Sequence, residues 1–216
     1  LKKIKYGANK MKKVLNLIMA ALFMVALVLP ANAKGDVAGS SAGDFLKVGA
    51  AGSQFLKIGV GARASGMAGA FTAAADDLSS LYWNPAGLAD IKSMGADFHY
   101  TQWFAGFSHN FAAISMPLTE NFTVAAHLIS FDSDRIPITT MAQPEGTGSY
   151  YTVSDMSVGA SVSGYLTDQF SFGITAKYIT NSFSSLNSNG FAFDIGTMYD
   201  TELQGIKLGF SIFNLG

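Results

Sequence analysis

The strongest pattern in the sequence is a two-residue alternation of apolar with small or polar side chains beyond about residue 93. In the run 154–166, apolar residues such as Val158 and Val162 alternate with Ser157 and Ser161. Successive side chains of a β-strand point to opposite faces, so this period predicts strands with one apolar and one polar face. Similar runs at 170–178, 191–199 and 206–212, with earlier ones, give about seven strands.

Such strands fit either a soluble β-sandwich, whose apolar faces pack together, or a membrane barrel, whose apolar faces meet lipid. Aromatic residues recur near the expected strand ends, as an interfacial girdle requires, and the polar faces carry occasional charges. These features favour an all-β, antiparallel transmembrane barrel, and the sandwich is the alternative. The aromatic positions are Tyr100, Trp103, Phe104, Phe131, Tyr165, Phe170 and Tyr199, and the polar-face positions are Asp97, His99, His127, Asp155, Lys177, Asp194 and Lys207.

The connections between the expected strands alternate in length, apart from a tight first hairpin near Ala105. Bacterial barrels have short periplasmic turns and longer extracellular loops, so the alternation places the long connections outside the cell. The expected strands are odd in number, whereas single-chain barrels have an even number, so we interpret residues 93–216 as the first half of a barrel. The short connections are 117–121, 167–169 and 200–205, and the long ones are 132–151 and 181–190.

The first 33 residues have the organisation of a secretory signal peptide. Counted from Met11, Lys12 and Lys13 form a basic region, Val14–Leu29 an apolar region, and Ala31–Ala33 an A-x-A cleavage site. The apolar region has 16 residues, fewer than the roughly 20 that a membrane-spanning helix needs. We therefore predict export and cleavage after residue 33, with either Leu1 or Met11 as the start.

Removal of the signal peptide changes the charge of the protein. Six lysines and no acidic residue precede residue 34, which leaves eight basic against fifteen acidic residues and a net charge of −7. This acidity argues against a nucleic-acid partner. With no cysteine, the chain has no disulfide, thiolate metal site or cysteine lipid anchor. Half of the residues are hydrophobic, yet no segment after residue 33 has 18 consecutive apolar residues, which excludes a helical membrane protein.

Residues 34–92 differ from the rest, because glycine and alanine dominate them. The small residues of 62–75 predict a short helix, and Pro85 and Gly87 predict a turn. Two acidic residues, Asp76 and Asp77, lie between them, and we expect a contact from Asp77 to a lumen cation such as Lys177. The candidate site residues of this segment are Asp76, Asp77, Trp83, Asn84, Pro85 and Gly87.

The segment QFLKIGVGARASGMAGAFTAAADDLSSLYWNPAGLA, residues 54–89, resembles the N-terminal signature of the PorV/PorQ outer-membrane proteins, and its NPAGL element resembles that of FadL-type channels. The runs GTGSYYTVSD (146–155) and LTDQFSFGITAKYI (166–179) are similar to barrel segments of the same family. The resemblance implies a FadL-like barrel of 14 strands in the outer membrane of a Gram-negative bacterium. It also implies that residues 34–92 fold into the lumen as a hatch.

No residue pattern points to an enzyme, a cofactor or a metal site. The three histidines, His99, His109 and His127, lie on separate expected strands without a supporting serine or acidic motif. We therefore expect no catalytic, cofactor-binding or metal-binding residues.

Two functions are compatible with the resemblance. The first is a scaffold of type IX secretion that binds the translocon and exported cargo, with Ile136, Pro137, Ile138 and Met141 of the 132–151 loop facing the cargo. The alternative is a channel in which hatch movement admits a hydrophobic small molecule. The expected lumen face is rich in serine, glycine and threonine, which favours the scaffold.

Overall fold

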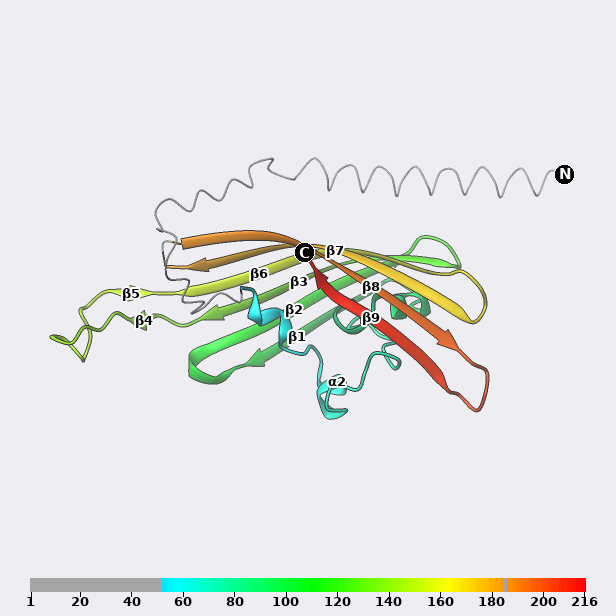
Figure 1. Ribbon diagram of the computed structural model, residues 1–216, viewed down its shortest axis with the longest axis horizontal. Helices are drawn as coiled ribbons and strands as arrows, with labels where there is room; N and C mark the ends of the chain where they lie inside the picture. The colour runs from blue at the N-terminus through cyan, green and yellow to red at the C-terminus, as the bar shows by residue number, and fades with distance from the viewer. Residues whose placement is uncertain (1–51, 185) are drawn as a thin grey trace, which may run out of the picture. The chain divides into compact units, whose positions relative to one another are not determined.

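The structure, a computed structural model, describes residues 52–184 and 186–216 (Figure 1). The expected signal peptide, residues 1–33, and the first part of the expected hatch, residues 34–51, lie outside the described residues. The described chain has two parts. Residues 52–94, here called the covering segment, form short helices and turns, and residues 95–216 form antiparallel β-structure.

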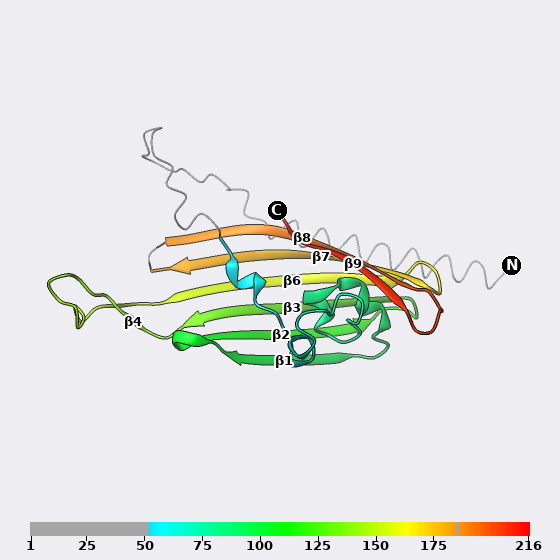
Figure 2. The same cartoon turned by 60° about the horizontal axis from the view of Figure 1, so that its bottom comes forward.

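One antiparallel sheet contains seven of the described strands, in the order β1-β2-β3-β6-β7-β8-β9. Each strand pairs with the one before it in this order, so every connection within the sheet is a hairpin-type connection (Figure 2). The all-β antiparallel class and the number of strands expected from the alternation are confirmed for this part of the chain. The strands are β1 (Gly95–Gln102), β2 (Phe107–Pro117), β3 (Phe122–Ser133), β6 (Val153–Tyr165), β7 (Phe170–Phe183), β8 (Leu186–Asp200) and β9 (Lys207–Leu215).

The helices are all short. The helix expected over residues 62–75 forms only as α2 (Ala62–Gly66), because Ala68 (φ 53°) and Gly69 (φ 79°) take left-handed backbone conformations that end it. None of the helices that the structure describes has the length and apolar character of a membrane-spanning helix. The others are η1 (Gln54–Lys57), α3 (Ser80–Trp83), η2 (Pro85–Asp90) and η3 (Phe104–Gly106).

Both expected long loops are more ordered than the sequence predicted. The 181–190 loop was a wrong prediction, because β7 and β8 extend through it, with Asn181 opposite Ser188 and Ser182 opposite Asn187. Polar residues extend these strands beyond the alternating region because backbone hydrogen bonds, rather than apolar burial, hold the hairpin together. Residues of the 132–151 loop form a second, two-stranded sheet of β4 (Ile136–Pro137) and β5 (Tyr150–Tyr151), which projects past the main sheet in Figure 1.

The covering segment lies across one face of the main sheet, shown toward the viewer in Figure 2. Leu56, Val60, Leu81 and Leu88 of this segment share one buried cluster with sheet residues such as Phe111. Burial of an aliphatic side chain of this size contributes about 1.5–3 kcal/mol, so this cluster is the main attachment of the segment to the sheet.

In a typical water-soluble sheet, the covered face carries the large apolar side chains and the exposed face carries the polar ones. In this sheet that arrangement is reversed. Small and polar side chains, among them Ser157, Thr175 and Asp194, are buried on the covered face, whereas Val158, Ile174 and Phe193 on the opposite face are exposed. We call this opposite face the apolar outer face. Its large exposed hydrophobic residues on the strands include Phe98, Ile114, Leu128, Met156, Val158, Ile174, Phe191, Phe193, Ile195, Leu208, Phe210 and Ile212.

Two residues of the expected aromatic girdle lie on the other side. Phe131 follows the parity of buried Ile129 and stacks on Phe107 at 4.8 Å between ring centroids. Tyr165 donates its hydroxyl hydrogen to the Asp90 carboxylate of the covering segment. Both girdle predictions were wrong because alternation along the strands puts Phe131 on the face of buried Ile129 and Tyr165 on the face of buried Ser163, which is the covered face.

Candidate functional site

Asn84 is the centre of the contact between the covering segment and the sheet, and it is fully buried. Its side-chain Oδ1 accepts from the Ala86 backbone N–H at 3.1 Å and so caps η2, whose first residue is Pro85. Its Nδ2 donates to the backbone carbonyls of Thr72 (2.8 Å) and Thr197 in β8 (3.2 Å). This buried amide therefore uses both of its N–H donors and one hydrogen bond to its oxygen to join a turn, a loop and a strand.

The Asn84–Pro85–Ala86 turn lies in a notch formed by two glycines of the sheet. A Cβ atom on Gly196 would lie 2.0 Å from Asn84 Oδ1, and one on Gly173 would lie 2.2 Å from the Pro85 backbone. Ser163 completes the notch by donating its hydroxyl hydrogen to the Ala86 carbonyl at 3.0 Å. The absence of side chains at these two glycines is what allows backbone to approach backbone here.

The remaining motif residues hold the covering segment together. Gly87 is required because the Ala75 carbonyl oxygen lies 1.8 Å from the position of a Cβ atom. The Trp83 indole N–H donates to the Val60 carbonyl at 2.8 Å, and the ring lies over Gly59. The Trp83 carbonyl in turn accepts from Ser211 of β9 at 3.3 Å. The motif from Trp83 to Gly87 thus attaches the covering segment to the sheet, and we call this attachment the seat. Its buried side chains contact other parts of the protein rather than open space.

Asp76 and Asp77 do not reach Lys177. Both carboxylates instead contact Arg63 of α2: Asp76 in a short charge-assisted hydrogen bond and Asp77 at 3.3 Å. The expected contact between Asp77 and Lys177 is therefore wrong, because an arginine within the same segment is closer. Arg63 also lies 5.0 Å from the centre of the Phe71 ring, which stabilises the loop by a cation–π contact.

The hydrogen bond from Arg63 holds the pKa of Asp76 below its ordinary value. A carboxyl whose pKa is lower in the folded than in the unfolded state stabilises the fold above its unfolded pKa, and this contribution is lost as the pH falls. Arg63→Gln is expected to raise the pKa of Asp76 toward the ordinary value, which carbon-13 NMR titration of labelled aspartates would measure. An unchanged Asp76 titration in that variant would contradict the assignment of Arg63 as the cause.

Lys177 pairs with Asp194 instead, and these two are the most buried charged side chains of the sheet. Its Nζ lies 2.8 Å from Asp194 Oδ2, and the two side chains are only 7% and 1% exposed. Lys177 also donates to Asn214 Oδ1 at 2.5 Å, and the Asn214 backbone N–H donates to Asp194 Oδ1 at 2.8 Å. The three residues form a closed polar triad across β7, β8 and β9, beside the register shift at Phe193 and Ile195.

Tyr82 of the covering segment is close enough to the triad for the charge of Asp194 to act on its phenol. Its hydroxyl donates to the Leu56 carbonyl at 3.0 Å. Burial, and secondarily the charge of Asp194, raises the pKa of Tyr82 to about 12. The phenol therefore stays protonated at neutral pH and acts as a hydrogen-bond donor between α3 and η1.

The four residues of the expected cargo-facing loop lie in the β4–β5 hairpin, and the structure brings them onto one projection. Ile136 pairs with Tyr151 and Pro137 with Tyr150, while Ile138 exchanges backbone hydrogen bonds with Thr147 and Ser149. The Met141 side chain at the tip is fully exposed. The sequence indicated an exposed loop but did not reveal that it is a hairpin.

The sequence also did not identify Gly173, Gly196 and Asn214 as site residues. The two glycines lie on strand faces made of small and polar residues. Their small size was the only feature of the sequence that could have identified them as site residues. Within the described residues, no three His, Asp or Glu side chains come together in a group that could hold a metal ion. Comparison of the sequence with protein-family models gave no match, and comparison with curated proteins gave none either.

Proposed function

We propose that this protein is an outer-membrane β-barrel of the PorV/PorQ type, that residues 34–92 form its hatch, and that it is a scaffold for exported cargo in type IX secretion. The observation that carries the membrane assignment is the reversed sheet, with buried Ser157 beside exposed Val158. An apolar face of this extent is unstable in water, whereas transfer of each large side chain into lipid contributes about 1.5–3 kcal/mol.

The scaffold role is supported by the β4–β5 hairpin. This hairpin carries exposed apolar side chains at Ile138, Met141 and Tyr150 on a backbone that internal hydrogen bonds hold in place. A rigid apolar projection loses little conformational entropy on binding, which suits a protein-binding element. In the proposed barrel, this hairpin is the long connection between β3 and β6, and it faces the cell exterior.

The hatch role is supported by the seat of Asn84 and Pro85 on the covered face. The attachment combines buried apolar side chains with hydrogen bonds to β6, β8 and β9. A segment attached in this way is a fixed part of the barrel in the scaffold function. In the alternative, a channel for hydrophobic small molecules, the same contacts would have to break during transport.

The membrane assignment is tested by placing single cysteines on neighbouring residues of β6, because the natural chain has no cysteine. Val158→Cys lies on the apolar outer face and Ser157→Cys on the covered face, one residue away. With a bimane label in vesicles of brominated lipid, we expect strong quenching at position 158 and little at position 157. Equal quenching at the two positions would contradict the barrel.

The scaffold assignment is tested by co-purification from detergent-solubilised outer membranes. We expect Met141→Asp with Ile138→Asp to reduce recovery of a translocon barrel or cargo domains at least about fivefold, because charges at both positions disrupt an apolar contact. Leu203→Asp is the matched control, since Leu203 is an exposed leucine in the turn between β8 and β9. An intact protein that carries only lipid or hydrocarbon would favour the channel instead.

A further inference from the structure

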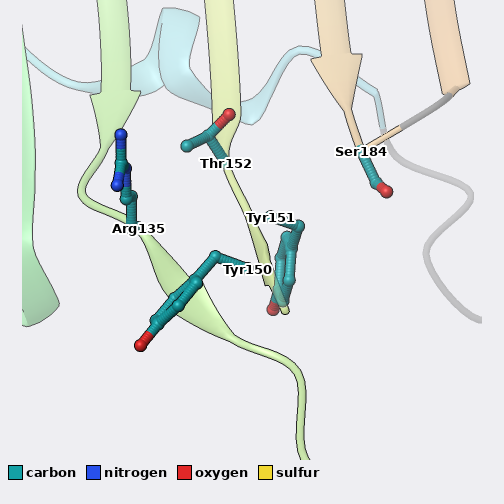
Figure 3. Close-up of a pocket in the computed structure, with 5 residues that line it drawn as sticks. All are labelled: Arg135, Tyr150, Tyr151, Thr152 and Ser184. Carbon is teal, nitrogen blue, oxygen red and sulfur yellow. The ribbon is translucent and has the colours of Figure 1, made fainter. Parts of the chain in front are cut away.

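A hollow of about 570 Å³ lies at the base of the β4–β5 hairpin, where the hairpin meets the end of β7 (Figure 3). Its lining comes from three segments of the chain: Arg135 before β4, Tyr150 to Thr152 in and after β5, and Ser184 after β7. Its volume lies in the range of small-molecule sites, roughly 300–1,000 Å³.

The walls of the hollow are held in place by contacts outside it. The Ser184 backbone N–H donates to the Thr152 carbonyl at 3.3 Å, and the Tyr151 ring packs edge-on against Phe183 at 5.3 Å between centroids. Ser133 accepts from the Val153 backbone N–H at 2.8 Å, which fixes the start of β6. The hollow therefore exists between ordered segments rather than within a single loop.

The polar groups that line the hollow have no partner among the described residues. The Arg135 guanidinium and the hydroxyls of Tyr150, Tyr151, Thr152 and Ser184 form no side-chain hydrogen bond or ion pair with any of them. Other polar side chains of this region are paired, as with Asp132, which accepts from Ser154 at 2.6 Å. Five polar side chains thus line one hollow, and all of them except Tyr151 are exposed to solvent.

The charge of Arg135 is not neutralised by its sequence neighbour. Asp134 points toward the β1–β2 hairpin, where its carboxylate lies 2.8 Å from the position of a Cβ atom on Gly106, and its backbone N–H donates to the Gly106 carbonyl. Asp132 is occupied by Ser154. Among the described residues Arg135 therefore has no carboxylate partner, and it lines the same hollow as Tyr150 and Tyr151.

This combination of groups matches one class of ligand. A guanidinium binds a carboxylate or phosphate through paired hydrogen bonds. Tyrosine rings present an electron-rich face to the polarised C–H groups of a sugar, and hydroxyl side chains bond to sugar hydroxyls. We propose that the hollow at the base of the β4–β5 hairpin binds an acidic sugar, with Arg135 holding its carboxylate or phosphate and Tyr150 and Tyr151 lying against its ring.

The proposal is tested by isothermal titration of the detergent-solubilised protein with D-glucuronate, glucose 1-phosphate and D-glucose. We expect both acidic sugars to bind at least about tenfold more tightly than D-glucose, because the charge-assisted contact is lost in the neutral sugar. Equal binding of the three sugars, or no binding of the acidic ones at tens of millimolar, would overturn the proposal.

The variants locate the site. Arg135→Gln is expected to weaken binding of D-glucuronate at least about tenfold, while Arg135→Lys retains part of it. Lys207→Gln, which removes an exposed cation at the start of β9, serves as the matched control and leaves binding unchanged. Arg135 is exposed and has no ion-pair partner among residues 52–184 and 186–216, so its variants should fold, and unchanged heat-modified gel migration verifies this. Equal loss in the Arg135 and Lys207 variants would overturn the site.

The source of the sugar is distinguished by competition. Displacement of D-glucuronate by lipopolysaccharide vesicles assigns the site to a glycolipid headgroup, and displacement only by a soluble oligogalacturonate assigns it to a free acidic glycan. The titration is independent of the cargo experiment, because it needs no translocon or exported protein. Failure of either proposal therefore leaves the other intact.

Discussion

Lys177→Met is expected to reduce the free energy of unfolding by about 3–5 kcal/mol, because it leaves the Asp194 carboxylate buried without its cation. The Lys177 and Asp194 side chains are almost completely buried, and Asn214 forms one hydrogen bond with each of them. The measurement is urea unfolding of the protein folded into lipid vesicles, followed by tryptophan fluorescence. A loss below 1 kcal/mol would show that water or another residue replaces the cation.

A double variant separates the charge from the packing in this triad. Lys177→Met combined with Asp194→Asn removes both charges, yet the new amide oxygen can still accept from the Asn214 backbone N–H. We expect it to recover most of the stability that Lys177→Met loses, since an uncompensated charge is the main cost. Lys207→Met is the surface control: its 3.7 Å contact with Asp90 is partly exposed, and we expect a change of about 0–1 kcal/mol.

Gly196→Ala is the second variant with a large expected effect, because its new methyl group would lie 2.0 Å from Asn84 Oδ1 and 2.8 Å from Pro85 Cδ. Neither atom can move far, since Asn84 is tied to Thr72 and Thr197. We expect the covering segment to shift from its notch, with a loss of about 1–3 kcal/mol. Limited trypsin digestion would detect the shift as faster cleavage at Arg63.

The control for this variant lies on the same strand. Gly190→Ala is six residues away in β8, on the same face, and no atom lies within 4 Å of its new Cβ atom. Its stability and its rate of cleavage should match those of the natural protein. If Gly190→Ala is as damaging as Gly196→Ala, the effect belongs to the strand backbone and not to the seat of Asn84.

The Gly196→Ala experiment bears on function through the covering segment. The scaffold requires the segment to remain seated, whereas the channel requires its release. The tight notch around Asn84 opposes release, because hydrogen bonds join the Asn84–Ala86 turn to β8 and β6. Gly196→Ala therefore offers a way to loosen the segment without touching the β4–β5 hairpin, and cargo recovery by this variant would show whether the hairpin acts alone.

The strands and their two faces could be predicted from the sequence because alternation is a local property. Val158 and Ser157 point to opposite sides of any strand that contains them, so the period alone fixed which residues share a face. The turns at Thr167–Gln169 and near Ala105 were visible for the same reason. Alternation does not reveal which distant residue each side chain contacts.

Only the tertiary structure decided the contacts between segments distant in sequence. Asp77 is nearer to Arg63 than to Lys177 because the covering segment folds back on itself, and Lys177 meets Asp194 because the β7–β8 register brings them together. In the sequence, Gly196 is one of many small residues on a polar strand face. In the structure, Asn84 takes up the space that a side chain at Gly196 would fill. Sequence period sets the face of a residue, but register and chain reversal set its partner, since these depend on many residues at once.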